Sequence, residues 1–445
     1  NGRSITMSRV EKEIPLSYKF NLPAVIDTVC YGGKILEIAR EEGNWIVLDN
    51  HLQQHFFDLL RKCSIEEALA VSNCSDEDVN VVVMQLVARH FEKRVRYQRL
   101  SPIMQLYLTN GCNMHCPHCY MYAGNKLDSE MTTDEVKSVL NAYRKSGGMD
   151  VKLTGGEIAL RKDLIDIIVY GDSIGLRIDL LTNGTLWKKS MIEKVVPHIN
   201  SVQISIDGYN EVENAKVRGI GNFEKALRAV DTFVHCGAIV KVAITANYSP
   251  DINNKVEEFA NFAKELKQKY RDYKFDVDVA TGLLPGRYGK LSERETVEYE
   301  QATLEINNRY IECSDVRNAA YIKRHRSGIV LTNCSYGYPT IAANGDVHFC
   351  PVTAMTQPIA NIRTMPLDEI MDMCKRAHEM SETKNLEPCN HCELKAICGG
   401  DCRLNFRDLK LANVMNVKAP RRECNSQIKE KFYDIMIQTN EAIFH

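Results

Sequence analysis

The sequence predicts an α/β protein in three parts: a short module of strands and helices, a longer segment in which strands and helices alternate, and a cysteine-rich C-terminal segment. Three observations lead to this prediction. Between residues 104 and 284, apolar runs of strand length alternate with amphipathic runs of helix length. Before residue 97, strand-like runs precede helical runs. Beyond residue 300 the alternation ends and closely spaced cysteines begin.

The N-terminal module is expected to be a small winged-helix-like unit. Its strand candidates, separated by the turns YGG and EEGN, are residues 24–30, 34–40 and 44–49. Its helix candidates are residues 51–62, 64–71 and 75–94. Side chains suited to capping these helices precede them at Asp49, Asn50, Ser64 and Ser75.

The central segment is expected to consist of six strand–helix units. Its strand candidates are residues 104–110, 149–155, 177–183, 201–207, 239–247 and 275–282. Helical runs between them include residues 133–145, 162–173, 222–236 and 253–268. Such repetition predicts right-handed connections around a parallel sheet, with functional residues at the carboxyl ends of the strands. Noteworthy residues at or just past these ends are Cys112, Gly155, Asn183, Asp207 and Asn247.

Charge and hydropathy exclude several classes of partner. The 56 basic residues nearly balance the 58 acidic ones, which gives no support to binding of nucleic acid or a membrane surface through bulk charge. Nothing in the sequence resembles an 18-residue apolar span or the apolar core of a signal peptide. We therefore expect a cytoplasmic protein that binds neither nucleic acid nor a membrane.

Cysteine is unusually frequent for such a protein, with 16 residues. In a reducing compartment this frequency indicates metal binding more than disulfides. The first of two groups is Cys112, Cys116 and Cys119, and the second is Cys334, Cys350, Cys389, Cys392, Cys398, Cys402 and Cys424. Buried, inert thiols are the default interpretation of the other six: Cys30, Cys63, Cys74, Cys236, Cys313 and Cys374.

The first group has the spacing C-x3-C-x2-C and directly follows the first central strand. Three thiolates leave one iron of a [4Fe–4S] cluster without a protein ligand, and an open iron site is a reaction site. The alternative is a zinc site completed by His115 or His118.

This spacing, after the first strand of a βα repeat, resembles the radical S-adenosylmethionine (SAM) superfamily. The resemblance implies a partial (β/α)6 barrel, with SAM chelated to the open iron through its amine and carboxylate. It also implies reductive cleavage of SAM to a 5′-deoxyadenosyl radical, which abstracts a hydrogen atom from the substrate. One departure is His118, since an aromatic residue often precedes the third cysteine in the family. Histidine keeps a planar ring there.

Short motifs after the later strands match positions that contact SAM in this superfamily. In TGGE, residues 154–157, the glycine pair would meet the methionine amine, since glycine permits close backbone approach. SIDG, residues 205–208, would lie near the ribose hydroxyls, and TNGT ends the third strand. Arg218 would grip the SAM carboxylate with its guanidinium fork, unless it is an ordinary surface arginine. The implied cofactor-binding residues are Gly155, Gly156, Glu157, Asn183, Ser205, Asp207 and Arg218. No general base stands out.

The C-terminal cysteines read C-x10-G-x4-C, then C-x2-C-x5-C-x3-C, then a final cysteine. This pattern resembles the SPASM domain of radical SAM enzymes, whose members bind two auxiliary [4Fe–4S] clusters. The resemblance implies an outer cluster on Cys389, Cys392, Cys398 and Cys424, and an inner cluster on Cys334, Cys350 and Cys402. The fourth inner ligand is either Cys313 or a cysteine thiolate of the substrate. A zinc ribbon fits less well, because seven cysteines do not divide into closed sites of four.

The N-terminal module resembles the PqqD-like precursor-recognition element of enzymes that modify ribosomally made peptides. The resemblance implies that a leader peptide adds a strand at residues 44–49 and packs against the helix at residues 79–91. A DNA-binding winged helix is the main alternative, but the candidate recognition helices lack a basic face. The second alternative is that the module is an inert packing domain.

Together these resemblances predict a leader-binding domain at residues 1–100, a radical SAM barrel at residues 101–300 and a SPASM domain at residues 301–445. The expected cofactors are SAM and three [4Fe–4S] clusters, and the expected partners are a precursor peptide and a reductant such as flavodoxin or ferredoxin.

The expected reaction is an intramolecular crosslink in the peptide, with a thioether favoured over a carbon–carbon or carbon–oxygen bond. One alternative is a sulfatase-maturase-like oxidase that makes formylglycine. Another is a protein without catalytic activity, an iron–sulfur electron carrier or redox sensor.

Overall fold

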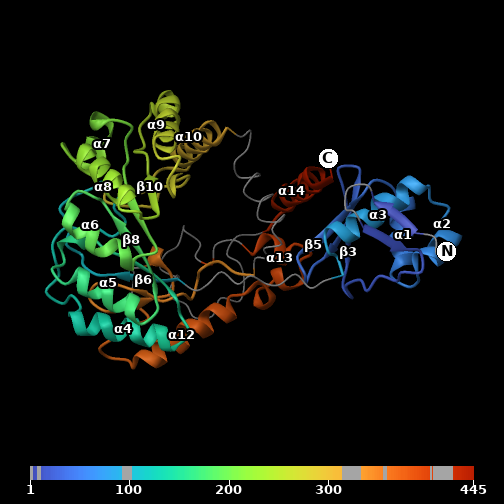
Figure 1. Ribbon diagram of the computed structural model, residues 1–445, viewed down its shortest axis with the longest axis horizontal. Coiled ribbons are helices and arrows are strands. Elements are labelled where there is room, and N and C mark those ends of the chain that lie inside the picture. The colour runs from blue at the N-terminus through green and yellow to red at the C-terminus, as the bar shows by residue number, and fades with distance from the viewer. Residues whose placement is uncertain are drawn as a thin grey trace.

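The computed structural model describes residues 4–7, 12–92, 103–312, 332–353, 358–400, 403 and 424–444. Figure 1 shows the strand–helix segment at the left and the N-terminal module at the right, with α13 (Lys395–Cys398) and α14 (Ser426–Phe444) between them. Two of the expected cluster residues, Cys313 and Cys402, lie outside the described residues.

The N-terminal module is a three-stranded antiparallel sheet followed by three helices, as the sequence predicts. Its elements are β3 (Asp27–Tyr31), β4 (Lys34–Ala39), β5 (Asn44–Leu48), α1 (His51–Leu60), α2 (Ile65–Ser72) and α3 (Asp76–Ala88), with the strands in the order β3-β4-β5. The helices begin at Asn50, Ser64 and Ser75, whose side chains each accept the backbone N–H three residues further on. One core joins the helices to the sheet through Ile46 and Leu48.

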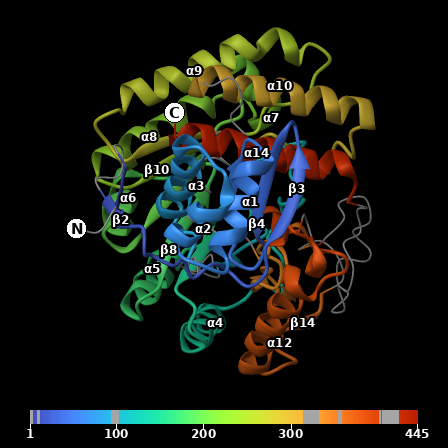
Figure 2. The same ribbon diagram turned by 90° about the vertical axis from the view of Figure 1, so that its right-hand side faces the viewer.

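A two-stranded hairpin, which the sequence did not predict, precedes this module. It pairs β1 (Ser4–Met7) with β2 (Lys12–Pro15), and β1 lies against α3. Figure 2, viewed onto the module, shows β2 on the left and β3 on the right of the three helices.

The central segment forms the parallel sheet that the six strand candidates predict. The strands are β6 (Ile103–Tyr107), β7 (Asp150–Thr154), β8 (Arg177–Thr182), β9 (Ser201–Ser205), β10 (Val240–Ile244) and β11 (Phe275–Val279). Each pairs in parallel with the next along the chain, so all six carboxyl ends reach the same edge of the sheet. Among the described residues the sheet runs in linear order, and β6 does not meet β11. The result is an open, partial barrel.

Helices connect and cover these strands. They are α4 (Thr133–Lys145), α5 (Leu164–Ser173), α6 (Lys189–Val195), α7 (Glu211–Arg218), α8 (Phe223–His235), α9 (Val256–Lys269) and α10 (Glu293–Ile311). Four of them, α4, α5, α8 and α9, match the predicted helical runs. Short 3-10 helices occupy Ile158–Leu160, Val196–His198, Ile252–Lys255, Pro351–Thr353, Thr383–Asn385 and Cys389–His391. No helix in the described part of the chain is both long and apolar enough to cross a bilayer.

The first part of the cysteine-rich segment extends the central sheet. Its elements are β12 (Thr340–Ile341), β13 (Asp346–His348), β14 (Ala360–Asn361) and α12 (Leu367–Met380). β12 pairs in parallel with β6, and β13 and β14 follow in antiparallel order. Ile341, Phe349 and Ile370 are buried in the same core as the barrel strands.

The last part of the chain packs instead on the N-terminal sheet. Trp45 and Leu36 form one core with Ile397 of α13 and Met436 of α14. The Trp45 indole N–H donates to the Met436 carbonyl at 3.0 Å. The described part of the segment after residue 300 is therefore divided between the core of the barrel and that of the N-terminal module.

We predict that Trp45 reports on this packing. Trp45 and Trp187 are the only tryptophans, so a Trp187→Phe variant would emit from Trp45 alone. Because Trp45 is 1% exposed, removing residues 426–445 should shift its fluorescence to longer wavelength by exposing the indole. Lys431→Ala, at an exposed position of α14, is the matched control that should leave the emission unchanged. An unshifted spectrum after truncation would contradict the described packing.

Candidate functional site

The three-cysteine loop leaves β6 at the edge of the sheet where the strands end. The loop is closed at its base by two hydrogen bonds, from Cys112 N to Gly124 O at 2.8 Å and from Gly124 N to Asn110 O at 2.9 Å. Cys116 is buried, and Cys112 and Cys119 are half-buried and pack with it in one apolar cluster. The structure therefore brings the three predicted ligands together.

Burial raises the pKa of Cys116 to about 11, and the pKa of Cys112 is raised for the same reason. Negative charge on Asp207 and on the other two cysteines raises the pKa of Cys116 further, whereas Arg218 opposes the shift. Since the thiolate is the metal ligand, cluster binding must replace these protons. Among the described residues, no three His, Cys, Asp or Glu side chains are arranged to hold a single metal ion.

A second segment, Gly286–Arg287 after the last central strand, braces the loop. The Arg287 guanidinium donates to the carbonyl of Cys116 at 2.9 Å and also to that of Ala123. A Cβ at Gly286 would lie 2.5 Å from the His118 carbonyl carbon, so only glycine permits this approach. Tyr122 adds a hydrogen bond to the Gly286 carbonyl at 3.0 Å. Nothing in the sequence marked Gly286 or Arg287 as contacts of this loop, because Arg287 and Cys116 are 171 positions apart.

The glycine pair of TGGE lies against the same loop. Gly156 N donates to Thr109 O at 2.7 Å, and a Cβ at Gly156 would lie 2.2 Å from Gly111 O. Gly155 has a φ of +148°, and its Cβ would lie 2.4 Å from Thr109 O. The approach that requires glycine here is therefore between two protein backbones. The expected contact between the backbone of Gly155–Gly156 and the amine of SAM remains a prediction.

Glu157 joins neighbouring strand ends from a fully buried position. Its carboxylate accepts the Thr182 hydroxyl at 2.6 Å, Asn183 N at 2.8 Å and Ala159 N at 3.0 Å. Burial raises the pKa of Glu157, although these hydrogen bonds oppose the shift. Both carboxylate oxygens thus bind protein groups, which makes Glu157 a structural link between β7 and β8.

Asn183 connects the end of β8 to the three-cysteine loop. Its side-chain amide donates to Asn113 Oδ1 at 2.9 Å, and Asn113 in turn donates to the Thr185 hydroxyl at 3.0 Å. Asn113 is the residue after Cys112. The third strand end therefore positions the first of the three cysteines.

Asp207, Arg218 and His118 form a charged group beside the cysteines. Asp207 is completely buried, and its Oδ2 lies 2.6 Å from Arg218 Nε and 3.4 Å from His118 Nε2. Its other oxygen accepts Thr245 N at 2.9 Å. Ser205, two residues earlier, is half-buried at the end of β9.

The pKa values of this group follow from burial and charge. Burial lowers the pKa of Arg218, but the charges of Asp207 and Cys116 outweigh it, and the pKa is raised overall. Burial lowers the pKa of His118 despite the neighbouring Asp207. Arg218 is therefore a buried cation in an ion pair, which rules out an ordinary surface arginine. No sequence motif marked His118 as a partner of Asp207.

Among the tail cysteines, the proposed outer ligands lie near one another. Cys392 and Cys398 pack on the core shared by the N-terminal sheet and α14, and Cys389 and Cys392 are joined by a backbone hydrogen bond of 3.0 Å. Burial raises the pKa of Cys392 to about 12, with a smaller contribution from Cys424. Of the proposed inner ligands, Cys334 and Cys350 both pack on the barrel core.

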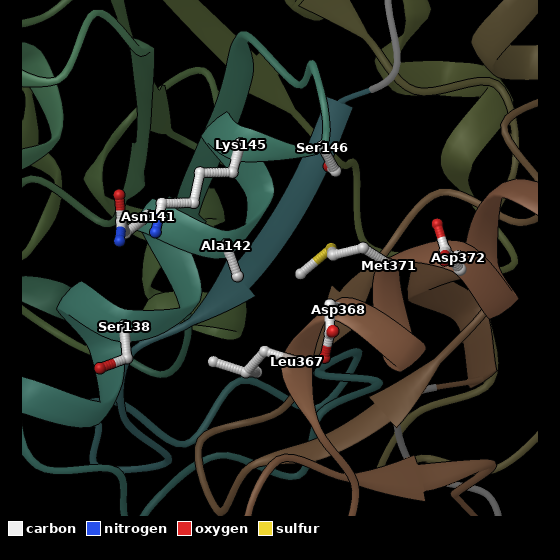
Figure 3. Close-up of a pocket in the computed structure, with 9 residues that line it drawn as sticks. All are labelled: Ser138, Asn141, Ala142, Lys145, Ser146, Leu367, Asp368, Met371 and Asp372. Carbon is white, nitrogen blue, oxygen red and sulfur yellow. The ribbon is translucent and has the colours of Figure 1, made fainter.

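A cavity of about 590 Å³ lies elsewhere, between α4 and α12 (Figure 3). It is lined by Ser138, Asn141, Ala142, Lys145, Ser146, Leu367, Asp368, Met371 and Asp372. The lining residues of α4 run from its middle to its C-terminal end, which leads into the start of β7 and so lies away from the strand ends. None of the predicted site residues lines this cavity.

Comparison with known proteins identifies two of the three parts. Residues 106–263 match the radical SAM superfamily, and residues 334–393 match the SPASM iron–sulfur cluster-binding domain. The AdoMet-dependent heme synthase of Methanosarcina barkeri (strain Fusaro / DSM 804) is 28% identical over 322 residues, which cover 66% of this chain and 89% of that protein. The sporulation killing factor maturation protein SkfB of Bacillus subtilis (strain 168) is 24% identical over 294 residues, which cover 65% and 69%.

Among solved structures, native anSMEcpe with bound AdoMet and Cp18Cys peptide has a TM-score of 0.54 at 16% identity. The match covers 76% of this chain and 99% of that one. This similarity supports the fold.

The residues present fit SAM and an iron–sulfur cluster. The donor set is three cysteines on one braced loop, and beside it His118 Nδ1 is buried without a hydrogen bond to any described residue. Such an atom would bind a polar ligand favourably, since an unsatisfied buried group costs free energy. Cys112, Cys116 and Cys119 would hold the cluster, while Asp207 and Arg218 would face the polar groups of SAM.

We predict that Arg287→Ala weakens cluster binding. The change leaves the Cys116 and Ala123 carbonyls without their charged donor, and each lost bond of this kind costs roughly 1.5–3 kcal/mol. Iron content and the visible absorbance of the reconstituted protein should fall, and SAM cleavage should fall with them. Lys290→Ala, three residues away and exposed, should match the wild type. Full iron content in Arg287→Ala would show that the brace is dispensable.

We predict that Asp207→Asn weakens SAM binding. The variant loses the negative partner of Arg218, and one charge-assisted contact corresponds to roughly tenfold or more in affinity. Equilibrium binding of SAM to the cluster-loaded protein measures the effect, with exposed Glu224→Gln on α8 as the control. Wild-type affinity in Asp207→Asn would remove this residue from the proposed SAM contacts.

Proposed function

Because the chain is a radical SAM enzyme with a SPASM domain, we propose that it forms an intramolecular crosslink in a ribosomally synthesised precursor peptide. The proposal of a peptide substrate is supported by the packing of the N-terminal module. This module lies directly on the segment that contains the proposed outer-cluster cysteines. Arg40 donates to the His391 carbonyl at 3.0 Å, and Lys395 pairs with Glu41 at 2.6 Å. A module held in this way would present a bound peptide to the catalytic part from a fixed position.

Within the barrel, each group of residues has a defined task. Three cysteines would hold the cluster, Arg287 keeps their loop in place, and the pair of Asp207 and Arg218 would orient SAM. SAM bound to a reduced [4Fe–4S] cluster supplies the 5′-deoxyadenosyl radical that abstracts a hydrogen atom from the substrate. Gly155, Gly156, Glu157, Asn183 and Ser205 keep the strand ends and the loop together or lie beside them.

The crosslink we favour is a thioether between a peptide carbon and a cysteine sulfur. The carbon loses a hydrogen atom to the 5′-deoxyadenosyl radical, and the thiol loses a proton. One electron remains, and the auxiliary clusters on the SPASM cysteines are suited to accept it. The proposed inner set of Cys334, Cys350 and Cys402 has one ligand fewer than a cluster has irons. Either Cys313 or a thiolate of the peptide would fill the fourth position, and the second possibility is why a thioether is favoured over a carbon–carbon or carbon–oxygen bond.

Two other reactions are consistent with the same domains. A sulfatase-maturase-like oxidation to formylglycine would use the same barrel and SPASM tail. A tetrapyrrole substrate is suggested by the heme synthase relative. Neither alternative accounts for the N-terminal module.

We predict that small cysteine-containing peptides encoded beside the gene change mass when co-expressed with the enzyme. A thioether would remove two hydrogen atoms and one alkylatable thiol, as measured by mass spectrometry after anaerobic purification. The variant Cys116→Ala should leave the peptides unmodified, because it removes a ligand of the SAM-binding cluster.

Other results would change the assignment. Loss of two hydrogens with every thiol still alkylatable would indicate a carbon–carbon or carbon–oxygen bond. Unmodified peptides beside active SAM cleavage would refute the crosslinking proposal and favour one of the two alternatives.

A further inference from the structure

The three-stranded sheet of the N-terminal module has two edges, and the edge formed by β5 is closed by side chains of the module itself. The side-chain amide of Gln85, on α3, binds both backbone groups of Val47. Gln85 Oε1 accepts Val47 N at 2.8 Å, and Gln85 Nε2 donates to Val47 O at 2.6 Å. These are the two hydrogen bonds that an added strand would form with Val47. Gln85 is only 3% exposed, so a peptide would have to displace a buried, fully bonded amide.

The neighbouring outward amides of this edge are closed in the same way. Trp45 N donates to Asn44 Oδ1 at 3.0 Å, and Asp49 N donates to Gln53 Oε1 at 2.8 Å. Residues 45, 47 and 49 are every second residue along the strand. Their backbone N–H and C=O groups are therefore the ones that point away from β4. All five residues of β5 are buried. Moreover, β1 lies against α3, the helix that a peptide beside β5 would contact.

Among the described residues, no further strand pairs with the opposite edge, β3. β3 and β4 are joined by the two-residue turn Gly32–Gly33, in which both residues have positive φ, of 58° and 74°. In such a turn the flanking pair, Tyr31 and Lys34, is hydrogen-bonded. By alternation, the N–H and C=O groups of Thr28 and Cys30 point outward. No hydrogen bond joins these backbone groups to a described residue beyond β4.

The composition of β3 does not protect this edge. Natural edge strands are usually blocked by lysine, proline or a bulge, because free N–H and C=O groups template pairing with another chain. β3 reads DTVCY, with none of these features, and Thr28 and Cys30 are exposed. Figure 2 shows β3 at the side of the module away from β2 and α3.

The side chains beside β3 define the chemistry of an added strand. Val29 and Tyr31 face the core shared with α13 and α14, so alternate apolar side chains of an added strand would extend that core. Asp434 and Glu430 of α14 lie beside Tyr31 and raise the pKa of its hydroxyl, chiefly through the hydrogen bond to Asp434. Acidic groups at this end favour a basic side chain on the added strand.

We propose that an extended segment of the peptide substrate pairs with β3, rather than with β5 and α3 as the sequence led us to expect. The segment would bond to the free backbone groups of Thr28 and Cys30, with alternate apolar residues and a basic residue toward α14. This inference rests on the proposed function and specifies how its peptide is held. A second copy of the chain would satisfy the same edge, and the test distinguishes it.

Hydrogen–deuterium exchange on the full, cluster-loaded chain tests the site directly. The probes are the synthetic cysteine-containing peptides encoded beside the gene. Added peptide should slow exchange at residues 27–31 and leave residues 44–48 unchanged, because the latter amides are already bonded. Slowed exchange at residues 44–48 and 79–91 alone, or no change in any segment, would overturn the inference.

A matched pair of variants at an exposed edge position provides the second test. Cys30→Pro removes the outward N–H and obstructs pairing, and proline is tolerated at such a position of an edge strand. Cys30→Ala keeps the N–H. We expect peptide affinity to fall about tenfold or more in Cys30→Pro and to stay near the wild-type value in Cys30→Ala. Equal affinities, with circular dichroism showing both variants folded, would refute the β3 site.

The experiments distinguish failure of the β3 peptide site from failure of the proposed crosslinking reaction. Peptides that are crosslinked normally by Cys30→Pro refute the β3 site and leave the proposed reaction standing. Protection of residues 27–31 by a peptide that is never modified supports the β3 site and refutes the reaction. A wild-type dimer that Cys30→Pro converts to monomer, with no effect of peptide on exchange, assigns the edge to a second copy and overturns the inference.

Discussion

The site depends on close backbone packing around a single loop. Three thiols on one short loop can face a common centre only if the loop itself is held, and apolar side chains alone do not hold it. The loop is held instead where glycines admit a neighbouring backbone: Gly156 against Gly111, and Gly286 against His118. Arg287 then binds a carbonyl on each side of the loop. Preorganisation of this kind fixes ligand geometry before any cofactor binds.

Electrostatics adds a second constraint. With a cluster bound, three thiolates and the buried carboxylate of Asp207 would concentrate negative charge in one place, which burial makes more costly. Arg218 is the cation that offsets it, and its ion pair with Asp207 explains why both residues are buried. The same charges would orient a zwitterionic cofactor that carries a carboxylate and an amine. Packing and charge thus converge on the edge of the sheet where the six strands end.

Much of this arrangement could be predicted from the sequence, because it depends on local patterns. The six strands follow from apolar runs, and the candidate residues follow from their position just after those runs. What could not be predicted depends on contacts between distant residues. Arg287 braces a cysteine 171 positions away, Trp45 docks on a helix 391 positions away, and Gln85 closes a strand 38 positions away. The glycines of TGGE were identified from the sequence, whereas their close contact with the backbone of Thr109 and Gly111 was not.

The central claim is that Cys112, Cys116 and Cys119 hold a cluster whose open iron binds SAM. Electron paramagnetic resonance of the reduced, fully reconstituted protein, recorded with and without SAM, tests it most directly. SAM should change the spectrum of one cluster, and the triple variant of these cysteines to alanine should lose that cluster and its response while retaining the auxiliary signals. A spectrum that SAM leaves unchanged, or a response that survives in the triple variant, would contradict the account.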